Sequence, residues 1–199
     1  MQFNKKQTLS GLIWIGIMSF SSIGWAQNPV SNAAKSIIDP SVIYDGSYQS
    51  IAYPNGDVAA DRGVCSDVIV RAYRTLNIDL QSAVHNDMRT HFNAYPSQRM
   101  WGLSKPDKNI DHRRVPNLET FLTRQGASLP ITKNPDNYRA GDIVSWRLHN
   151  GLPHIGIVID ERSQDKKRPL VVHNIGQGQI AEDVLFEWKI VGHFRYLPK

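Results

Sequence analysis

The order of local patterns along this chain constrains its fold more than any other sequence feature. Helical spacing of apolar residues predicts helices first, over residues 31–38, 64–76 and 80–92, and then from Pro116 to a stop at Gly126. Short apolar runs typical of strands follow only after these helices. Because helices and strands do not alternate, we expect an α+β fold with N-terminal helices packed on a C-terminal antiparallel sheet.

The predicted strands follow one another closely in the second half of the chain. Their residues are 141–146, 154–159, 169–173, 181–188 and 191–197. The polar stretch 93–115, which precedes the strands, is expected to be a loop. The sequence contains no internal repeat and no low-complexity segment, so we expect residues 27–199 to form a single domain.

Residues 1–26 have the three parts of a secretory signal peptide. Lys5 and Lys6 form a basic start, residues 12–18 an apolar run, and Gly24-Trp25-Ala26 a small-residue cleavage site. The apolar run is too short to span a bilayer, and no run of spanning length follows it, so we expect no integral membrane segment after removal of the signal. The expected location is the periplasm, and a retained N-terminal anchor is the alternative.

Composition excludes some classes of partner. The formal net charge is +5, and the basic residues are scattered along the chain rather than gathered in one stretch. A weak and dispersed charge does not predict binding to nucleic acid, although it suits the anionic cell envelope. The histidines other than His154 and His173 show no spacing typical of metal ligands, so we predict no metal and no cofactor. The sequence does not indicate an oligomeric state.

Cys65 is the only cysteine in the chain, and it stands where a polar loop gives way to the predicted helix 64–76. In an exported protein, a thiol with no disulfide partner in its own chain is a candidate nucleophile. The partial positive charge of a helix N-terminus also favours the thiolate over the thiol. The alternative is that Cys65 is a small buried hydrophobic residue, as free cysteines often are.

Two histidines lie at the ends of neighbouring predicted strands. His154 begins the strand 154–159 and His173 ends the strand 169–173, so antiparallel pairing would place them side by side. A nucleophilic thiol needs a base and a group that orients the base, and we assign these roles to His154 and His173. Asn174 is an alternative orienting residue. Both histidines could instead be hydrogen-bonded residues at strand ends with no catalytic role.

These motifs resemble those of the NlpC/p60 superfamily of papain-like cysteine peptidases, through Cys65-Ser66, His154-Ile155-Gly156-Ile157 and Val172-His173. The chain resembles more closely a bacterial domain-of-unknown-function family, number 1287, over about residues 35–197. The stretches that carry this second resemblance are 53–58, 61–68, 109–118, 152–158 and 172–176. The resemblance implies a papain-like α+β core in which Cys65 is the nucleophile, His154 the base and His173 its orienting residue.

The resemblance also implies a tyrosine 12 positions before the nucleophile, whose hydroxyl helps to stabilise the oxyanion, and Tyr53 occupies that position. A half-buried turn tyrosine is the alternative. The chain departs from the superfamily at Asp67, where a glycine is usual. This departure affects the expected substrate specificity more than the assignment of the nucleophile. Arg113 and Arg114 are candidate substrate-binding residues, because an arginine fork suits the carboxylates of a cell-wall peptide, and the alternative for them is an ion-pair cluster that ties the long loop to a helix. Asp67 is a candidate to bind a substrate amine or to perturb the thiolate, and the alternative is a helix-start residue that fits the helix dipole.

The resulting expectation is an exported cysteine hydrolase, a peptidase or amidase that cleaves an amide bond in or next to the stem peptide of peptidoglycan. The hydrolase class is inferred from the residues of the site. The peptidoglycan substrate is inferred only from export and from the resemblance, which is a weaker basis. A non-catalytic envelope-binding module on the same fold is one alternative, and a thiol enzyme that transfers or removes lipid acyl groups is another. An apolar groove beside Cys65 would favour lipid, and a polar cleft lined by Arg113, Arg114 or Asp67 would favour stem peptide.

Overall fold

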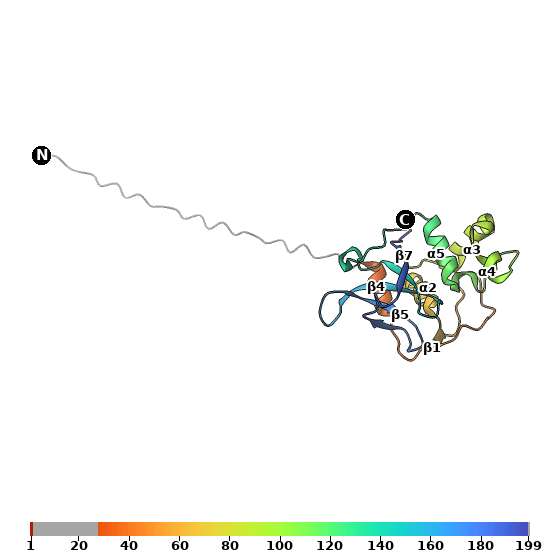
Figure 1. The fold of residues 1–199 in the computed structure, drawn as a ribbon, viewed down its shortest axis with the longest axis horizontal. Coiled ribbons are helices and arrows are strands. Elements are labelled where there is room, and N and C mark those ends of the chain that lie inside the picture. Colours follow the sequence, from red (N-terminus) through yellow and green to blue (C-terminus); the bar gives the residue numbers. More distant parts are fainter. Residues whose placement is uncertain (2–27, 199) are drawn as a thin grey trace.

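The computed structural model describes residues 28–198 together with Met1, so the predicted signal and its cleavage site lie almost wholly outside the described residues. The helices of the described part (Figure 1) are α1 (Pro29–Ser36), α2 (Cys65–Thr75), α3 (Leu80–His91), α4 (Ser97–Trp101) and α5 (Val115–Arg124), with short 3-10 turns at Phe92–Ala94, Asp111–Arg113 and Pro135–Asn137. The strands are β1 (Ile43–Tyr44), β2 (Arg62–Gly63), β3 (Ile143–Arg147), β4 (Pro153–Arg162), β5 (Pro169–His173), β6 (Ile180–Glu182) and β7 (Lys189–Phe194).

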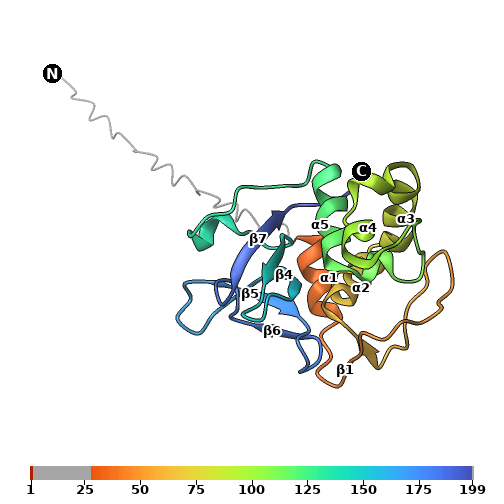
Figure 2. The ribbon, with the colours of Figure 1, turned by 45° about the vertical axis from the view of Figure 1, so that its right-hand side comes forward.

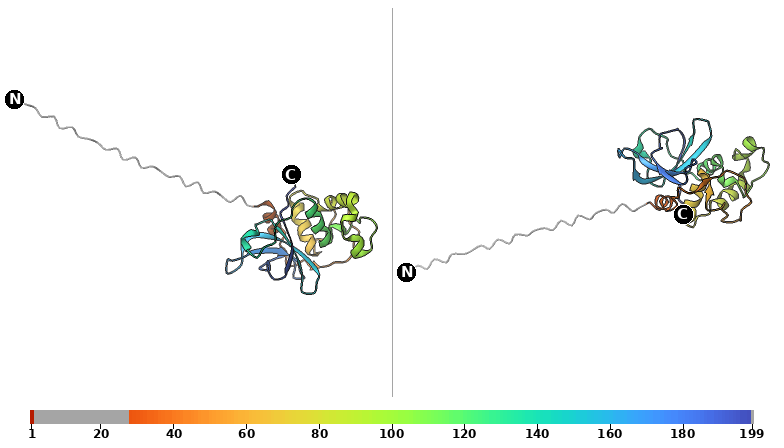
Figure 3. Two further views of the ribbon diagram at one scale, coloured as in Figure 1. Left: turned by 45° about the horizontal axis from the view of Figure 1, so that its top comes forward. Right: turned by 90° about the horizontal axis from the view of Figure 1, so that it is seen from below.

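The main sheet has five strands in the order β6-β5-β4-β3-β7, and every neighbouring pair is antiparallel. The helices gather on one side of this sheet, and the two groups form adjacent halves of the molecule (Figures 2 and 3). A second, two-stranded sheet pairs β1 with β2 in parallel. The α+β prediction is therefore confirmed.

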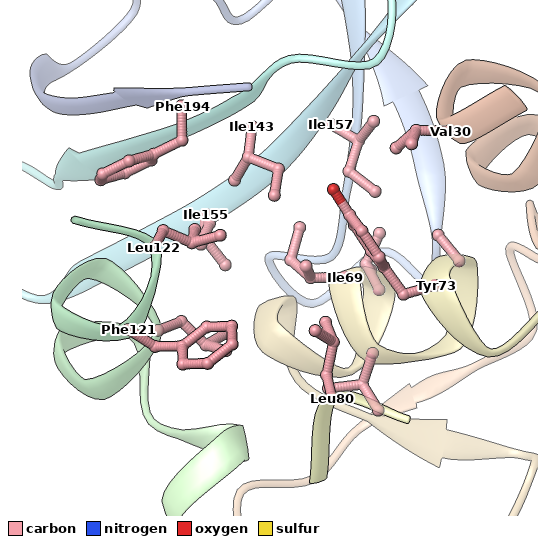
Figure 4. Packing of buried hydrophobic residues seen from close by; sticks show 14 of the residues in the cluster. Val30, Ile69, Tyr73, Leu80, Phe121, Leu122, Ile143, Ile155, Ile157 and Phe194 are labelled. Atoms are coloured by element: carbon pink, nitrogen blue, oxygen red, sulfur yellow. The ribbon is translucent and has the colours of Figure 1, made fainter. Parts of the chain in front are cut away.

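Helix α2 is packed between the sheet and the other helices. Its buried residues include Ile69 and Tyr73, which lie in one apolar cluster with Ile155 and Ile157 of β4 (Figure 4). Both positions of β4 belong to the face of the sheet that α2 covers, because side chains two apart on a strand share a face. Burial of this contact fixes the position of α2 against β4. The N-terminus of α2 therefore has a fixed position relative to the start of β4.

The opposite face of the sheet is covered as well. Val144, Trp146, Val158 and Val171 form a second buried cluster there with Leu185, which follows β6. The Trp146 indole Nε1 donates to the Leu185 carbonyl oxygen at 3.0 Å. Cover on both faces explains why the central strands are nearly continuous apolar runs in the sequence rather than alternating ones.

Two element predictions need correction. The first helix begins at Pro29, not residue 31, because the Asn28 side chain caps it by accepting from the Val30 N–H at 2.9 Å. The strand predicted over 181–188 ends at Glu182, and the following residues form turns that place Leu185 over the sheet. The apolar residues after Glu182 therefore contribute to the core without belonging to a strand.

The stretch 93–115, predicted to be a loop, contains the short helix α4 and the 3-10 turn Asp111–Arg113. Gly102 ends α4 in the left-handed conformation at φ 66°, a conformation that favours glycine. The Ser97 hydroxyl donates to Asn117 Oδ1 at 3.1 Å and ties α4 to α5. Such a short helix depends on tertiary contacts of this kind, which helical periodicity does not reveal.

No helix within the described part of the chain has the length and hydrophobicity needed to cross a membrane. The longest helix there, α3, spans 12 residues.

Gly156 allows β4 and β5 to approach closely behind the two candidate histidines. A Cβ atom at this position would lie 2.7 Å from Val171 Cγ1 and 2.9 Å from the Val172 carbonyl oxygen. The oxygen belongs to the backbone of β5, so any side chain at residue 156 must displace that strand. We therefore predict that Gly156→Ala lowers the free energy of unfolding by about 1–3 kcal/mol, measured by urea denaturation.

Gly46→Ala is the matched control, since a Cβ there would meet only Val64 Cγ1, at 3.7 Å. Equal stabilities of the two variants would contradict the role given to Gly156.

Candidate functional site

Cys65 is the first residue of α2, and its position depends on how that helix begins. The preceding residue, Val64, has no side chain that can cap a helix, and the carboxylate of Asp67 takes this role instead. Asp67 Oδ2 accepts a hydrogen bond from the Val64 N–H at 2.7 Å. The loop before the helix is thereby held in place, and Cys65 is left 4% exposed at the wall of a cleft.

The cleft beside Cys65 has a volume of about 500 Å³. It lies between the start of α2, the segment from Trp101 to Pro116, and the turn that leads into β4. His154 lines the same cleft. Most of the other lining side chains are apolar, including Tyr44, Trp101, Ile110, Val115, Leu148, Leu152 and Ile175.

The two predicted histidines are in direct contact. His154 Nε2 lies 2.9 Å from His173 Nδ1, and both residues are buried. Residues 28–198 provide no hydrogen-bond partner for His154 Nδ1, the second ring nitrogen of a residue that lines the cleft. On the far side, His173 Nε2 lies 3.0 Å from Glu182 Oε2 of β6. The order of contacts is therefore His154, His173, Glu182, running away from the cleft.

Asn174 is not the residue that contacts His154. Its amide Nδ2 donates to the Gly63 carbonyl oxygen at 3.3 Å, and its Oδ1 accepts from the Gly176 N–H at 2.9 Å. Gly63 lies two residues before Cys65, so Asn174 connects the end of β5 to the approach to α2. Of the two orienting residues considered from the sequence, the contact with the His154 ring is made by His173.

Two tryptophans pack around the histidine pair. Trp146 stacks on His154 with ring centroids 5.7 Å apart and an angle of 30° between the planes. Trp188 meets His154 edge-on at 5.5 Å and His173 at 6.2 Å. These rings exclude water from the imidazoles and restrict their rotation, which holds His154 at the wall of the cleft.

Burial keeps both groups of the predicted Cys-His pair neutral in the resting protein. It raises the pKa of the Cys65 thiol to about 12, although the backbone N–H of Ile155 acts in the opposite direction. Burial, together with the neighbouring His173, lowers the pKa of His154 to about 3. At neutral pH the resting site therefore holds an uncharged thiol and an uncharged imidazole at the same cleft, and the imidazole is able to accept a proton.

Asp67 and Arg113 form a buried bidentate ion pair. Arg113 Nε donates to Asp67 Oδ1 at 2.8 Å and Nη2 donates to Oδ2 at 2.9 Å, with the two side chains 3% and 2% exposed. The pair links the 3-10 turn before α5 to the first turn of α2. This geometry matches the ion-pair cluster that was the alternative to substrate binding for Arg113, and the position of Asp67 in the first turn of α2 matches the helix-start role that was its alternative.

Arg113 and Arg114 both line the cleft, but only Arg114 is free of the buried pair with Asp67. Its guanidinium lies over the Trp101 ring, 4.1 Å from the centroid, and Nη1 is 3.4 Å from Asp111 Oδ1. Its side chain is 19% exposed. Of the three predicted substrate-binding residues, Arg114 is the one whose charge is both at the cleft and accessible to solvent.

The structure does not bring Tyr53 to the cleft. Its ring packs edge-on against His85 of α3 at 5.2 Å, with Lys108 Nζ above it at 5.5 Å. The tyrosine that lines the cleft is Tyr44, whose pKa burial and the neighbouring Cys65 raise to about 12. Tyr44 comes to the site because β1 pairs with β2, with Tyr44 opposite Gly63.

Tyr44 and Glu182 are the site residues that the sequence did not indicate. The two-residue parallel pairing that places Tyr44 leaves no hydrophobic pattern in the sequence. Glu182 had a weak signal, since Ile180 pairs with His173 and Glu182, two residues further along β6, lies on the same face of the sheet. The described residues contain no group of three or more His, Cys, Asp or Glu side chains placed to hold a metal ion.

A family model described as "Domain of unknown function (DUF1287)" matches residues 31–196. The chain belongs to the DUF1287 family. Among curated proteins, it is similar to an uncharacterized protein of Escherichia coli strain K12, YijF, with 53% identity over 170 residues. That match covers 85% of this chain and 82% of YijF. The family match includes Cys65, both histidines and Glu182.

In this DUF1287 protein, removing one partner of the buried Asp67–Arg113 pair should destabilise the fold strongly. Asp67→Asn keeps an oxygen that can accept the hydrogen bond from the Val64 N–H, but it leaves the Arg113 charge buried without a counterion. We predict a loss of about 3–5 kcal/mol in the free energy of unfolding, measured by urea denaturation.

Asp183→Asn is the control for this variant, because Asp183 forms a bidentate pair with Arg168 in which both side chains are 33% exposed. That change should cost less than about 1 kcal/mol. If Asp67→Asn cost no more than the control, the pair would not have the structural role inferred from its burial.

Proposed function

We propose that this protein is a cysteine hydrolase that cleaves an amide bond through a thioester on Cys65. The observation that carries the proposal is the contact of His154 Nε2 with His173 Nδ1 at 2.9 Å, at a cleft that Cys65 also lines. A nucleophile, a base and a residue that holds the base are the groups that this chemistry needs. The proposed core is papain-like and of the NlpC/p60 type, which agrees with the resemblance and with the observed α+β architecture.

The proposed reaction begins with a neutral thiol and a neutral imidazole. His154 Nδ1 accepts the thiol proton as the Cys65 sulfur attacks the substrate carbonyl carbon. The tetrahedral intermediate then collapses, the carbon–nitrogen bond breaks, and His154 returns the proton to the leaving amine. Water, deprotonated by His154, attacks the thioester, and the carboxylic acid is released as Cys65 regains its proton.

Tyr44 is the proposed side-chain donor to the oxyanion, in the role that the resemblance implied for Tyr53. Its raised pKa, about 12, keeps the phenol protonated at neutral pH, so it can donate. The backbone N–H of Cys65, at the start of α2, is the proposed second donor. The partial positive charge of a helix N-terminus acts in the same direction.

The proposed substrate is peptidoglycan, cleaved at an amide bond in or next to the stem peptide, in the periplasm. Arg114 supports this choice, because its guanidinium faces the cleft and is held in orientation by Trp101 and Asp111. An oriented guanidinium is suited to a peptide carboxylate. The predicted signal peptide provides the route of export.

A second candidate is a thiol enzyme that hydrolyses or transfers lipid acyl groups. It is favoured by the apolar side chains that line most of the cleft, among them Leu152, which is 58% exposed at the rim, and Ile175, which is 37% exposed. Exposed apolar groups around a cleft bind an acyl chain favourably. The chemistry at Cys65 would be the same in both cases, and only the acyl group would differ.

The test is to incubate the purified protein and its Cys65→Ala variant with intact sacculi and with phospholipid vesicles, and to identify released products by mass spectrometry. We expect the wild type to release stem-peptide fragments from sacculi, and Cys65→Ala to release at least 10²-fold less. Release of fatty acid from vesicles, without fragments from sacculi, would favour the second candidate.

His154→Ala should lose activity to a similar degree, and His149→Ala is its matched control because His149 is exposed in the turn just before β4. Activity of Cys65→Ala equal to that of the wild type would remove the hydrolase proposal for that substrate.

A further inference from the structure

We propose that Glu182 is a positioning residue that selects the tautomer of both histidines, so that the lone pair of His154 Nδ1 faces the cleft. The inference rests on the proposed function, since it concerns the base of the same site. Glu182 is a third member of the series of contacts and lies on β6, a different strand from either histidine.

His173 and Glu182 are in contact on the side of the histidine pair away from the cleft. His173 Nε2 is buried with no aligned hydrogen-bond partner among the described residues, and Glu182 Oε2 lies 3.0 Å from it, at hydrogen-bond distance. Buried polar nitrogens in proteins are almost always satisfied. The Glu182 side chain is 36% exposed, so its carboxylate has room to rotate toward the N–H bond.

The charge of Glu182 determines on which nitrogen each histidine carries its proton. An ionised carboxylate only accepts hydrogen bonds, so Glu182 requires a proton on His173 Nε2. The uncharged His173 ring then has its lone pair on Nδ1, which accepts from His154 Nε2 at 2.9 Å. His154 therefore carries its own proton on Nε2, and its Nδ1 is left as the proton acceptor.

Glu182 also places a negative charge next to the histidine pair. Glu182 is the only charged side chain in the described structure that contacts either histidine, and it acts against the effect of burial on the pKa of His173. The other faces of the two rings are covered by Trp146 and Trp188, which are uncharged. When His154 accepts the thiol proton, the carboxylate of Glu182 is therefore a fixed negative charge, on the side away from the thiolate, that stabilises the resulting imidazolium.

The tautomers are measured directly by long-range ¹H–¹⁵N correlation NMR on the protein labelled at histidine. We expect both His154 and His173 of the wild type to carry their proton on Nε2. A proton on His173 Nδ1 in the wild-type protein would overturn the proposal, and this measurement does not depend on the folding of any variant.

The consequence for the thiol is measured by the rate at which iodoacetamide alkylates Cys65, the only cysteine in the chain, as a function of pH. Glu182→Gln keeps the size of the side chain and removes its charge, so the thiolate–imidazolium pair becomes less populated. We expect the alkylation rate at pH 7 to fall about tenfold, and the apparent pKa of the thiol to rise by about one unit.

Glu187→Gln is the matched control, because Glu187 is exposed in the turn before β7, and it should leave the rate unchanged. His154→Gln separates the two proposals. If it slows alkylation while Glu182→Gln has no effect on rate or tautomer, the role of Glu182 is refuted and the base remains. If His154→Gln has no effect either, the base assigned in the proposed function is also lost.

Discussion

The packing of α2 against β4 determines where the rest of the site lies. Ile69 and Tyr73 of the helix share one buried cluster with Ile155 and Ile157 of the strand, so neither element can shift without opening a cavity. Because Cys65 is the first residue of the helix and His154 the second residue of the strand, the same contact brings the thiol and the imidazole to one cleft. Gly156 extends this arrangement to β5, since only the absence of a side chain permits the close approach that places His173 beside His154.

Burial opposes the chemistry that the proposed function requires. The surroundings that exclude water raise the pKa of the Cys65 thiol and lower that of His154, so the charged pair is unfavourable in the resting protein. Compensation has to come from fixed groups: the start of α2, the Ile155 N–H beside the sulfur, and the carboxylate of Glu182 behind His173. The charge of Asp67 also raises the pKa of the Cys65 thiol, and its ion pair with Arg113 limits this unfavourable effect on the thiolate.

Local patterns predicted much of this fold and part of the site. The periodic segment 64–76 contains α2, and the apolar runs 154–159 and 169–173 lie on β4 and β5, so the meeting of the two histidines followed from strand order alone. Predictions were wrong or incomplete where tertiary contacts decide the structure. Leu185 is buried over the sheet without being part of a strand, and α4 is too short to leave a periodic signal. Tyr44 reaches the cleft through a parallel pairing of two-residue strands, which no local pattern marks.

The most direct test of the central claim is to trap the thioester. The protein is mixed with soluble muropeptides, quenched in acid within milliseconds to seconds, digested and mapped by mass spectrometry. The proposed reaction predicts that the peptide containing Cys65 carries an added acyl mass that hydroxylamine removes, and that prior alkylation of Cys65 abolishes both the adduct and turnover. Continued turnover by the alkylated protein, with Cys65 unacylated in every quenched sample, would contradict it.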